Sequence, residues 1–185
     1  MPTHQNEIRN SHMELDQVYF WTSTVKDWRA LFKNEKYIHF LLSSWKELVF
    51  REKICIYGFV IMPNHIHVIW EMLEVNGKEM PHASFNKFTS HLIVKDLKSN
   101  NSGLISAFKV EENDRDFRIW QRDPLAIWMD KKEKLEQKLN YIHLNPLQDH
   151  WNLVVYPEDY QWSSSRFYET GIDEFEFLTH YLDRF

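Results

Sequence analysis

Three stretches in the first half of the chain have the residue types of β-strands. Residues 17–25 are rich in aromatic and β-branched side chains, which favour a half-buried pleated surface. Residues 54–62 form a mostly apolar run that stops at Pro63-Asn64, a turn signal, and a third run covers residues 65–71. The last two strands are therefore predicted to be hydrogen-bonded neighbours or a tight hairpin.

Three other segments repeat their apolar residues with the period of a helix. The first follows Asn34, a residue type that can cap a helix N-terminus. Its apolar side chains are Ile38, Leu41, Leu42, Trp45, Leu48 and Val49. The second covers roughly residues 82–99, and the third covers residues 131–144 and ends before Pro146. The face predicted for the second helix consists of Phe85, Phe88, Leu92, Ile93 and Leu97.

The remaining segments have weaker patterns. Residues 100–116 are polar and charged with little periodicity, so they are predicted to form a loop, and Phe117–Trp120 is predicted to be a short strand. The tail after Pro157 is expected to contain short helical and irregular pieces. The predicted strands and helices alternate along the chain without a Gly-rich phosphate loop. The predicted fold class is therefore α+β, with a mostly antiparallel central sheet sandwiched by helices.

Composition limits the class of protein. A chain of 185 residues that is 43% hydrophobic can bury one real core, so one compact domain is expected. The single cysteine, Cys55, lies in an apolar run and is read as a small core side chain, which excludes disulfides and thiolate metal clusters. The polar N-terminus and the absence of ~18 consecutive apolar residues favour a soluble cytoplasmic protein without a membrane partner.

The distribution of charge matters more than the net charge of −5. An acidic balance argues at first against nucleic acid, because phosphate binders usually present a basic surface. However, the chain from Tyr141 onward holds 2 basic and 8 acidic residues, whereas the preceding 140 residues hold 20 basic and 19 acidic ones. The acidity therefore belongs mainly to the tail.

The first candidate for chemistry is the pair His65 and His67 in the third predicted strand. Side chains alternate between the two faces of a strand, so both imidazoles should point to one face while Ile66 and Val68 point toward packed helices. Two nitrogen ligands would then emerge together from a rigid sheet. Such a pair also occurs as ordinary hydrogen-bonded histidines, so it does not identify a metal site by itself.

The second candidate is the pair Tyr141 and Asn145 at the end of the third predicted helix. Residues four apart stack on one helical face, while Leu139 and Ile142, with Leu144 as a further candidate, supply the buried stripe. A phenol and an amide oxygen would then share one site. Alone, the spacing also fits a packed surface tyrosine and an asparagine that helps to end the helix before proline.

Several motifs along the chain together resemble a known family, the single-tyrosine HUH transposases. The resemblance is to insertion-sequence-200-like enzymes and especially to REP-associated tyrosine transposases. The motifs are YGFVIMPNHIHVIWEM, SFNKFTSHL, RIWQRD, and the stretch from LNYIHLNPLQDHW to PEDYQWSSSRFY. They stand in the family's order and span most of the chain. This combination of motifs is much harder to obtain by chance than any one of the short motifs alone.

The resemblance implies an enzyme that cleaves and rejoins single-stranded, hairpin-associated DNA. It assigns His65, His67 and the side-chain oxygen of Asn145 to a divalent cation, which acts as a Lewis acid on the phosphate. Mixed imidazole and amide ligation suits Mg²⁺ or Mn²⁺, with Zn²⁺ as the alternative. Tyr141 is then the nucleophile. The family's product is a 5′-phosphotyrosine with a free 3′-hydroxyl, and a second 3′-hydroxyl can reverse the step without ATP.

Three further side chains are candidates for DNA contacts. Gln121 and Arg122, in RIWQRD, are candidates for the phosphate backbone, with a solvated polar edge as the alternative. His143 lies two positions from Tyr141 on the helix and therefore faces elsewhere. It is not counted as a ligand and is retained as a candidate DNA contact.

The resemblance also implies an organisation for the chain. Residues 1–156 would form the catalytic domain, of the HUH nuclease type with a ferredoxin-like or RRM-like fold, and residues 157–185 a C-terminal extension packed on it. Relatives with a long extension tend to be monomers, so a monomer is expected, with a dimer as the alternative. After Asn145-Pro146 this chain has LQDHW where relatives commonly have a small basic stretch.

Two other functions stay open from the sequence. A non-catalytic single-stranded or hairpin DNA-binding module could keep the same fold, and the acidic charge favours it slightly. A metal hydrolase in which Tyr141 is incidental is the third reading. The joint presence of the tyrosine, the asparagine and both histidines favours the transposase.

Overall fold

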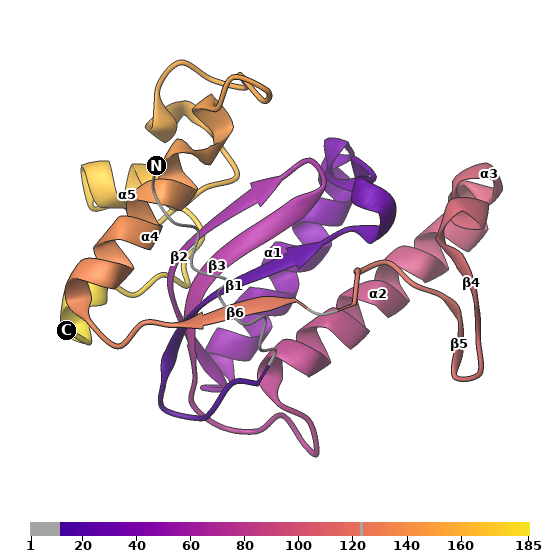
Figure 1. Ribbon diagram of the computed structural model, residues 1–185, viewed down its shortest axis with the longest axis horizontal. Helices are drawn as coiled ribbons and strands as arrows, with labels where there is room; N and C mark the ends of the chain where they lie inside the picture. The colour runs from indigo at the N-terminus through magenta and orange to yellow at the C-terminus, as the bar shows by residue number, and fades with distance from the viewer. Residues whose placement is uncertain (1–11, 123) are drawn as a thin grey trace, which may run out of the picture.

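The centre of the protein is a four-stranded antiparallel sheet (Figure 1). The computed structural model describes residues 12–122 and 124–185. In sheet order, the strands are β2 (Ile54–Met62), β3 (His65–Met72), β1 (Val18–Thr24) and β6 (Leu125–Trp128). The turn at Pro63-Asn64 joins β2 directly to β3 and pairs Met62 with His65. The predicted tight hairpin is therefore confirmed.

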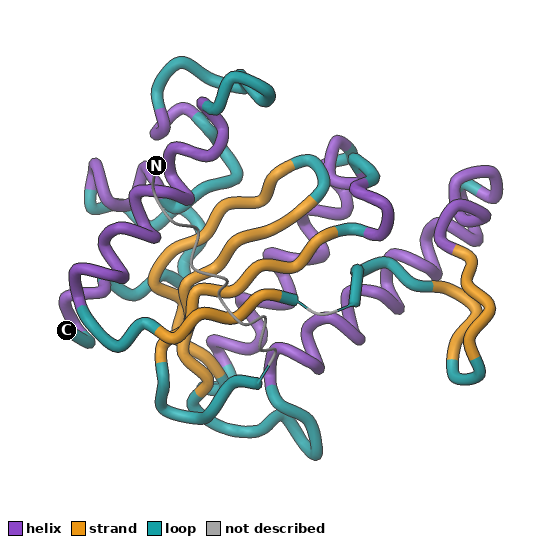
Figure 2. Tube along the Cα trace, viewed as in Figure 1, coloured by secondary structure: helices purple, strands orange, loops and turns teal. Residues whose placement is uncertain are grey.

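Helices cover both faces of this sheet, as the sequence predicts. On one face, α1 (Glu35–Phe50) and α2 (Pro81–Asn100) enclose the larger core. On the other face, α4 (Lys132–Leu144) packs over a smaller core. Figure 2 shows the sheet in orange between α4 and the α1–α2 pair. Ile66 and Val68 enter the larger core. His65 and His67 alternate with them along β3 and therefore face α4.

The two helices over the larger core follow the predicted pattern except at Phe88 and at Leu92, which is only partly buried and lies outside the buried stripe of α2. The side chain of Asn34 caps α1 by accepting a hydrogen bond from the backbone nitrogen of Lys36 at 3.1 Å. In α2 the prediction for Phe88 is wrong, because 53% of this residue is exposed. The buried stripe advances by four residues, and Thr89 takes the place expected for Phe88. The members of the stripe are Phe85, Thr89, Ile93 and Leu97.

The segment predicted to be a loop, residues 100–116, is instead folded, and that prediction is wrong. It contains α3 (Ser102–Ile105), a 3₁₀ turn, and the strands β4 (Lys109–Glu112) and β5 (Arg115–Phe117). These two strands form a separate hairpin that projects beside the C-terminal end of α2 (Figure 1). The predicted strand Phe117–Trp120 is also displaced, since β5 ends at Phe117 and Trp120 makes only an isolated bridge to Val25.

The C-terminal segment, residues 157–185, runs along the outer edge of β2. It contains α5 (Ser165–Thr170) and two 3₁₀ turns. The backbone nitrogen of Ile61 donates to the carbonyl of Trp162 at 2.8 Å, and that of Thr179 donates to Ile56 at 2.9 Å. The segment therefore supplies hydrogen-bond partners to a strand that would otherwise end the sheet. Within the described residues, no helix combines the length and apolarity needed to cross a membrane.

Candidate metal and nucleophile site

One pocket brings together the four side chains that the sequence assigned to metal binding and nucleophilic attack. It is an open cavity of about 440 Å³ between the sheet, the β2–β3 turn and the end of α4. Its lining consists of Thr22, Thr24, Trp28, Asn64, His65, His67, Tyr141, Asn145, Gln148, His150 and Trp151. Residues separated by 80 positions in the sequence thus share one site.

The two histidines lie side by side and are held in the neutral form. Their ring centroids are 4.7 Å apart, and each residue is less than a tenth exposed. Burial lowers the pKa of His65 to about 4, with a smaller contribution from His150. Burial, followed by the charges of His65 and Lys138, holds the pKa of His67 well below its usual range. Neutral imidazole is the form that ligates metal ions.

Hydrogen bonds to Nδ1 orient both rings. Nδ1 of His65 lies 2.7 Å from Oδ1 of Asn64, whose own Nδ2 donates to the carbonyl of Trp28 at 3.3 Å. An amide oxygen only accepts, so Nδ1 of His65 carries the proton and Nε2 keeps its lone pair. Nδ1 of His67 lies 2.7 Å from Oγ1 of Thr22. This is the arrangement in which metal-binding histidines are usually supported.

Asn145 contributes an oxygen that lacks a partner. The residue is 2% exposed, and its Oδ1 has no hydrogen-bond partner within the described part of the chain. A buried acceptor left without a partner costs roughly 1–3 kcal/mol, so its retention calls for an explanation. A bound cation at this position would supply the missing partner.

Tyr141 stands at the open side of the pocket. It is 42% exposed, and its ring centroid lies 5.4 Å from that of His67 and 6.2 Å from that of Phe20. Lys138, one helical turn earlier on α4, places its Nζ 5.9 Å from the centre of the tyrosine ring. The phenol is therefore accessible to a large substrate and has a cation beside it.

The donors in this pocket can hold a divalent cation without neutralising it. In residues 12–122 and 124–185, no three His, Cys, Asp or Glu side chains are arranged to hold a metal ion. The donor set is instead two imidazole nitrogens and one amide oxygen, all uncharged. A cation bound by such donors keeps its full charge, which favours an anionic ligand such as a phosphate.

The three candidate DNA contacts lie outside this pocket. His143 turns away from Tyr141, and its Nε2 lies 2.8 Å from the hydroxyl of Ser164 in the C-terminal segment. Gln121 and Arg122 line a second cavity, between α2 and the β4–β5 hairpin. Contact of these three residues with DNA stays a prediction.

Sequence reasoning missed the residues that support the predicted site. The sequence pattern predicts Asn64 only as part of a turn and Thr22 only as part of a strand. The signal for Thr22 is its register, because it pairs directly with His67 in the neighbouring strand. The signal for Lys138 is its spacing of three residues from Tyr141 on the same helix. Pairing across the sheet requires knowledge of which strands are neighbours.

The fold is similar to that of a transposase of known structure. A solved structure described as a REP-associated tyrosine transposase bound to a REP hairpin matches 92% of this chain and 90% of its own chain. The TM-score is 0.62 and the sequence identity is 17%. No protein-family model and no curated protein matches this sequence. The structural likeness bears out the predicted fold.

Proposed function

We propose that this protein is a metal-dependent tyrosine transposase that cleaves and rejoins single-stranded, hairpin-associated DNA. The observation that carries the proposal is one open pocket in which an exposed tyrosine lies beside two neutral imidazoles and an unpartnered amide oxygen. The REP-hairpin-bound transposase of similar fold supports the same class of substrate. The metal and the individual roles below are part of the proposal.

Each side chain then has a definite role. His65, His67 and Asn145 would hold Mg²⁺ or Mn²⁺, which would supply Lewis-acid polarisation of the scissile phosphate. The phenolic oxygen of Tyr141 forms a bond to phosphorus while the bond from phosphorus to the 3′-oxygen breaks. The phenolic proton passes to solvent, and the leaving 3′-oxygen takes up a proton to become a 3′-hydroxyl. Lys138 offsets the negative charge that gathers around the phenolic oxygen and the phosphate.

The product retains the energy of the original bond. The 5′ end of the cleaved strand stays attached to Tyr141 as a phosphodiester, so attack by another 3′-hydroxyl restores the phenol and joins two DNA ends. Trp28, which is 62% exposed on the rim of the pocket, offers a stacking surface for an unpaired base next to the scissile bond.

The charge of the protein favours one alternative, a DNA-binding module without catalysis. The net charge of −5 weakens the long-range attraction that phosphate-binding enzymes normally use. Such a module would bind hairpin DNA in the same place and form no covalent bond.

A covalent-adduct assay separates the alternatives. The protein is incubated with Mn²⁺ and labelled single-stranded DNA that contains a hairpin and a single-stranded flank, and is then resolved under denaturing conditions. We expect a DNA–protein adduct that is lost in Tyr141→Phe and when EDTA is present. Tyr156→Phe is the matched control, since Tyr156 is also exposed but does not line the pocket.

The other outcomes are equally informative. DNA binding without an adduct in the wild-type protein supports the module and contradicts the transposase. Metal-dependent cleavage that survives Tyr141→Phe would falsify the tyrosine mechanism and support a hydrolase.

A further inference from the structure

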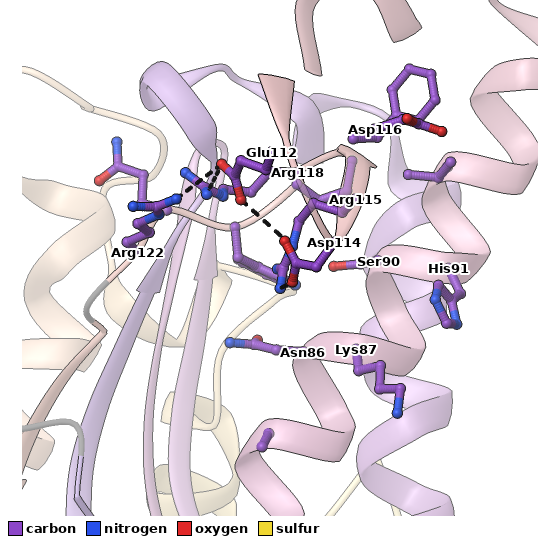
Figure 3. Close-up of a pocket in the computed structure, with 16 residues that line it drawn as sticks. Asn86, Lys87, Ser90, His91, Glu112, Asp114, Arg115, Asp116, Arg118 and Arg122 are labelled. Atoms are coloured by element: carbon purple, nitrogen blue, oxygen red, sulfur yellow. Dashed lines mark hydrogen bonds and ion pairs between the residues drawn. The ribbon is translucent and has the colours of Figure 1, made fainter. Parts of the chain in front are cut away.

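A second cavity of about 810 Å³ separates α2 from the β4–β5 hairpin and the segment that follows it. We call this cavity the arginine cleft. Figure 3 shows α2 side chains such as Asn86 and Ser90 on one wall and Glu112 with its arginines on the other. The charged side chains that line it are Lys87, Arg115, Arg118, Arg122, Glu112, Asp114 and Asp116. Basic residues outnumber acidic ones here, although the chain as a whole is acidic.

Three guanidinium groups in the cleft converge on a single carboxylate. Glu112 forms ion pairs with Arg118, with Arg122 at 3.2 Å and with Arg115 at 3.7 Å. Burial and the neighbouring charge of Arg122 lower the pKa of Arg118, which means that the two cations repel each other. Arg115 also pairs with Asp114, whose Oδ2 accepts a hydrogen bond from its Nε at 3.1 Å. Two carboxylates still cannot use all the donors of three guanidinium groups, so several N–H donors remain for a further anion.

The cleft also offers groups suited to a nucleotide rather than to a free anion. The side chains of Lys87, Arg115 and Arg122 are 60%, 51% and 67% exposed, so they can reach a bound polymer. On the α2 wall, Oδ1 of Asn86 is buried and has no hydrogen-bond partner within the described residues. Such an acceptor suits the amino group of a base, while guanidinium groups suit phosphate.

The cleft is a neighbour of the pocket that contains Tyr141, which we call the nucleophile pocket. Gln121 lines the cleft, Thr24 lines the pocket, and the backbone nitrogen of Gln121 donates to the carbonyl of Thr24 at 2.7 Å. Trp120 is tied to Val25 by an isolated bridge, so the wall between the two cavities is fixed to the end of β1. The two cavities therefore lie on either side of one short stretch of hydrogen-bonded backbone.

We infer that the arginine cleft binds the single-stranded DNA that adjoins the scissile phosphodiester, through phosphate contacts from Lys87, Arg115 and Arg122. This inference rests on the proposed function, because that function names DNA as the substrate. It goes further by assigning the single-stranded flank to a site distinct from the nucleophile pocket.

The test measures DNA binding without chemistry. All proteins carry Tyr141→Phe and are studied in EDTA by fluorescence anisotropy, with a bare hairpin and with the same hairpin carrying a flank of ten nucleotides on its 5′ or 3′ side. The cleft variant is Lys87→Ala/Arg115→Ala/Arg122→Ala. The matched control is Lys46→Ala/Lys132→Ala/Arg166→Ala, which removes the same charge from residues that lie outside the cleft and are 42–53% exposed.

We expect either the 5′ or the 3′ flank to lower the Kd by roughly tenfold or more, relative to the bare hairpin, in the Tyr141→Phe protein and in the control. In the cleft variant, the same flank should change the Kd little. The slope of log Kd against log salt for that probe should fall by about 2 in the cleft variant, since each phosphate contact to a single strand contributes about 0.7. Equal gains from the flank in both triple variants overturn the cleft while the proposed function stands. Failure of the Tyr141→Phe protein to bind any of the three probes overturns both.

Discussion

Among the single residues of the nucleophile pocket, Asn145 is the one whose placement packing does not explain. Its amide is buried at the end of α4, and its Oδ1 lacks a hydrogen-bond partner within the described residues. An apolar side chain of similar volume would avoid this cost. The position therefore behaves as one in which stability has been traded for the ability to hold a ligand.

Asn145→Leu tests this trade directly. In metal-free protein we expect the free energy of unfolding to stay equal or to rise by up to about 1 kcal/mol, because an unpartnered buried oxygen is removed. Adding Mn²⁺ should raise the melting temperature of the wild-type protein and leave that of the variant unchanged, since ligand binding stabilises only the form that binds.

Asn145→Asp is the companion variant, and it should retain stabilisation by Mn²⁺ because it keeps an oxygen donor. A large loss of metal-free stability in Asn145→Leu would mean that the amide is structural. Melting curves with and without metal, read alongside the adduct assay, distinguish the two roles.

The proposed metal ligands and nucleophile fall into two pairs whose local geometry could be predicted from the sequence, and the family resemblance placed the two pairs in one site. Alternation along one strand places His65 and His67 on one face, and one helical turn places Tyr141 over Asn145. The residues that orient the two imidazole rings could not be predicted in this way. Thr22 meets His67 only through strand pairing, and Asn64 acts through a side-chain hydrogen bond that no periodic pattern encodes.

Among the helices and strands, the contact between α4 and β2 sets the position of the tyrosine. A Cβ atom at Gly58 would lie 2.5 Å from Cδ1 of Leu139 and 3.3 Å from Oγ of Ser164. The helix therefore approaches the strand more closely than any residue with a side chain would allow. The hydrogen bond between His143 and Ser164 also ties this helix to the C-terminal segment.

Gly58→Ala should move α4 outward. We expect the free energy of unfolding to fall by about 1–2 kcal/mol, because the buried Leu139 must shift to make room for the methyl group. Adduct formation should slow by roughly tenfold or more, since small displacements of a nucleophile are costly, while hairpin binding persists.

Gly103→Ala is the control, because the nearest atom to a Cβ at that position lies 3.9 Å away. Denaturant unfolding and adduct kinetics provide the two measurements. Wild-type values for both in Gly58→Ala would show that the helix does not depend on this close approach.

The long amphipathic helices and the apolar strands followed from their periods, but the shorter elements did not. The β4–β5 hairpin is rich in charged residues, and Glu112 of β4 pairs with Arg115 of β5 and with Arg118 just after that strand. β6 spans only Leu125–Trp128, and its place beside β1 comes from long-range pairing. Hydrophobic periodicity reveals only elements that have a continuous buried face, so elements without such a face cannot be predicted from it.

At the scale of the whole molecule, the C-terminal segment supplies a cation to a buried carboxylate of the central sheet. The guanidinium of Arg184 lies 3.1 Å from both carboxylate oxygens of Glu71, a buried residue of β3. The same carboxylate accepts a hydrogen bond from the hydroxyl of Tyr57 at 2.6 Å. A charge inside the sheet is thus satisfied by a residue 113 positions later.

Arg184→Gln should destabilise the protein, because it leaves the buried carboxylate of Glu71 without its cation. We expect the free energy of unfolding to fall by about 1 kcal/mol, a value kept small because the arginine side chain is 42% exposed. Adding Glu71→Gln should recover part of the loss, since a neutral amide needs no cation. A double-mutant cycle by denaturant unfolding measures this coupling, and strictly additive losses would contradict the pairing.

The covered edge of β2 has a consequence for how the protein is made. Translation delivers His65, His67 and Tyr141 before the residues that pair with Ile56 and Ile61 and before Arg184. A nascent chain that holds every proposed reacting group therefore still presents an open strand and an uncompensated Glu71. A frameshift or stop codon just after Asn145 would accordingly yield a polypeptide prone to associate through β2, rather than a smaller folded protein.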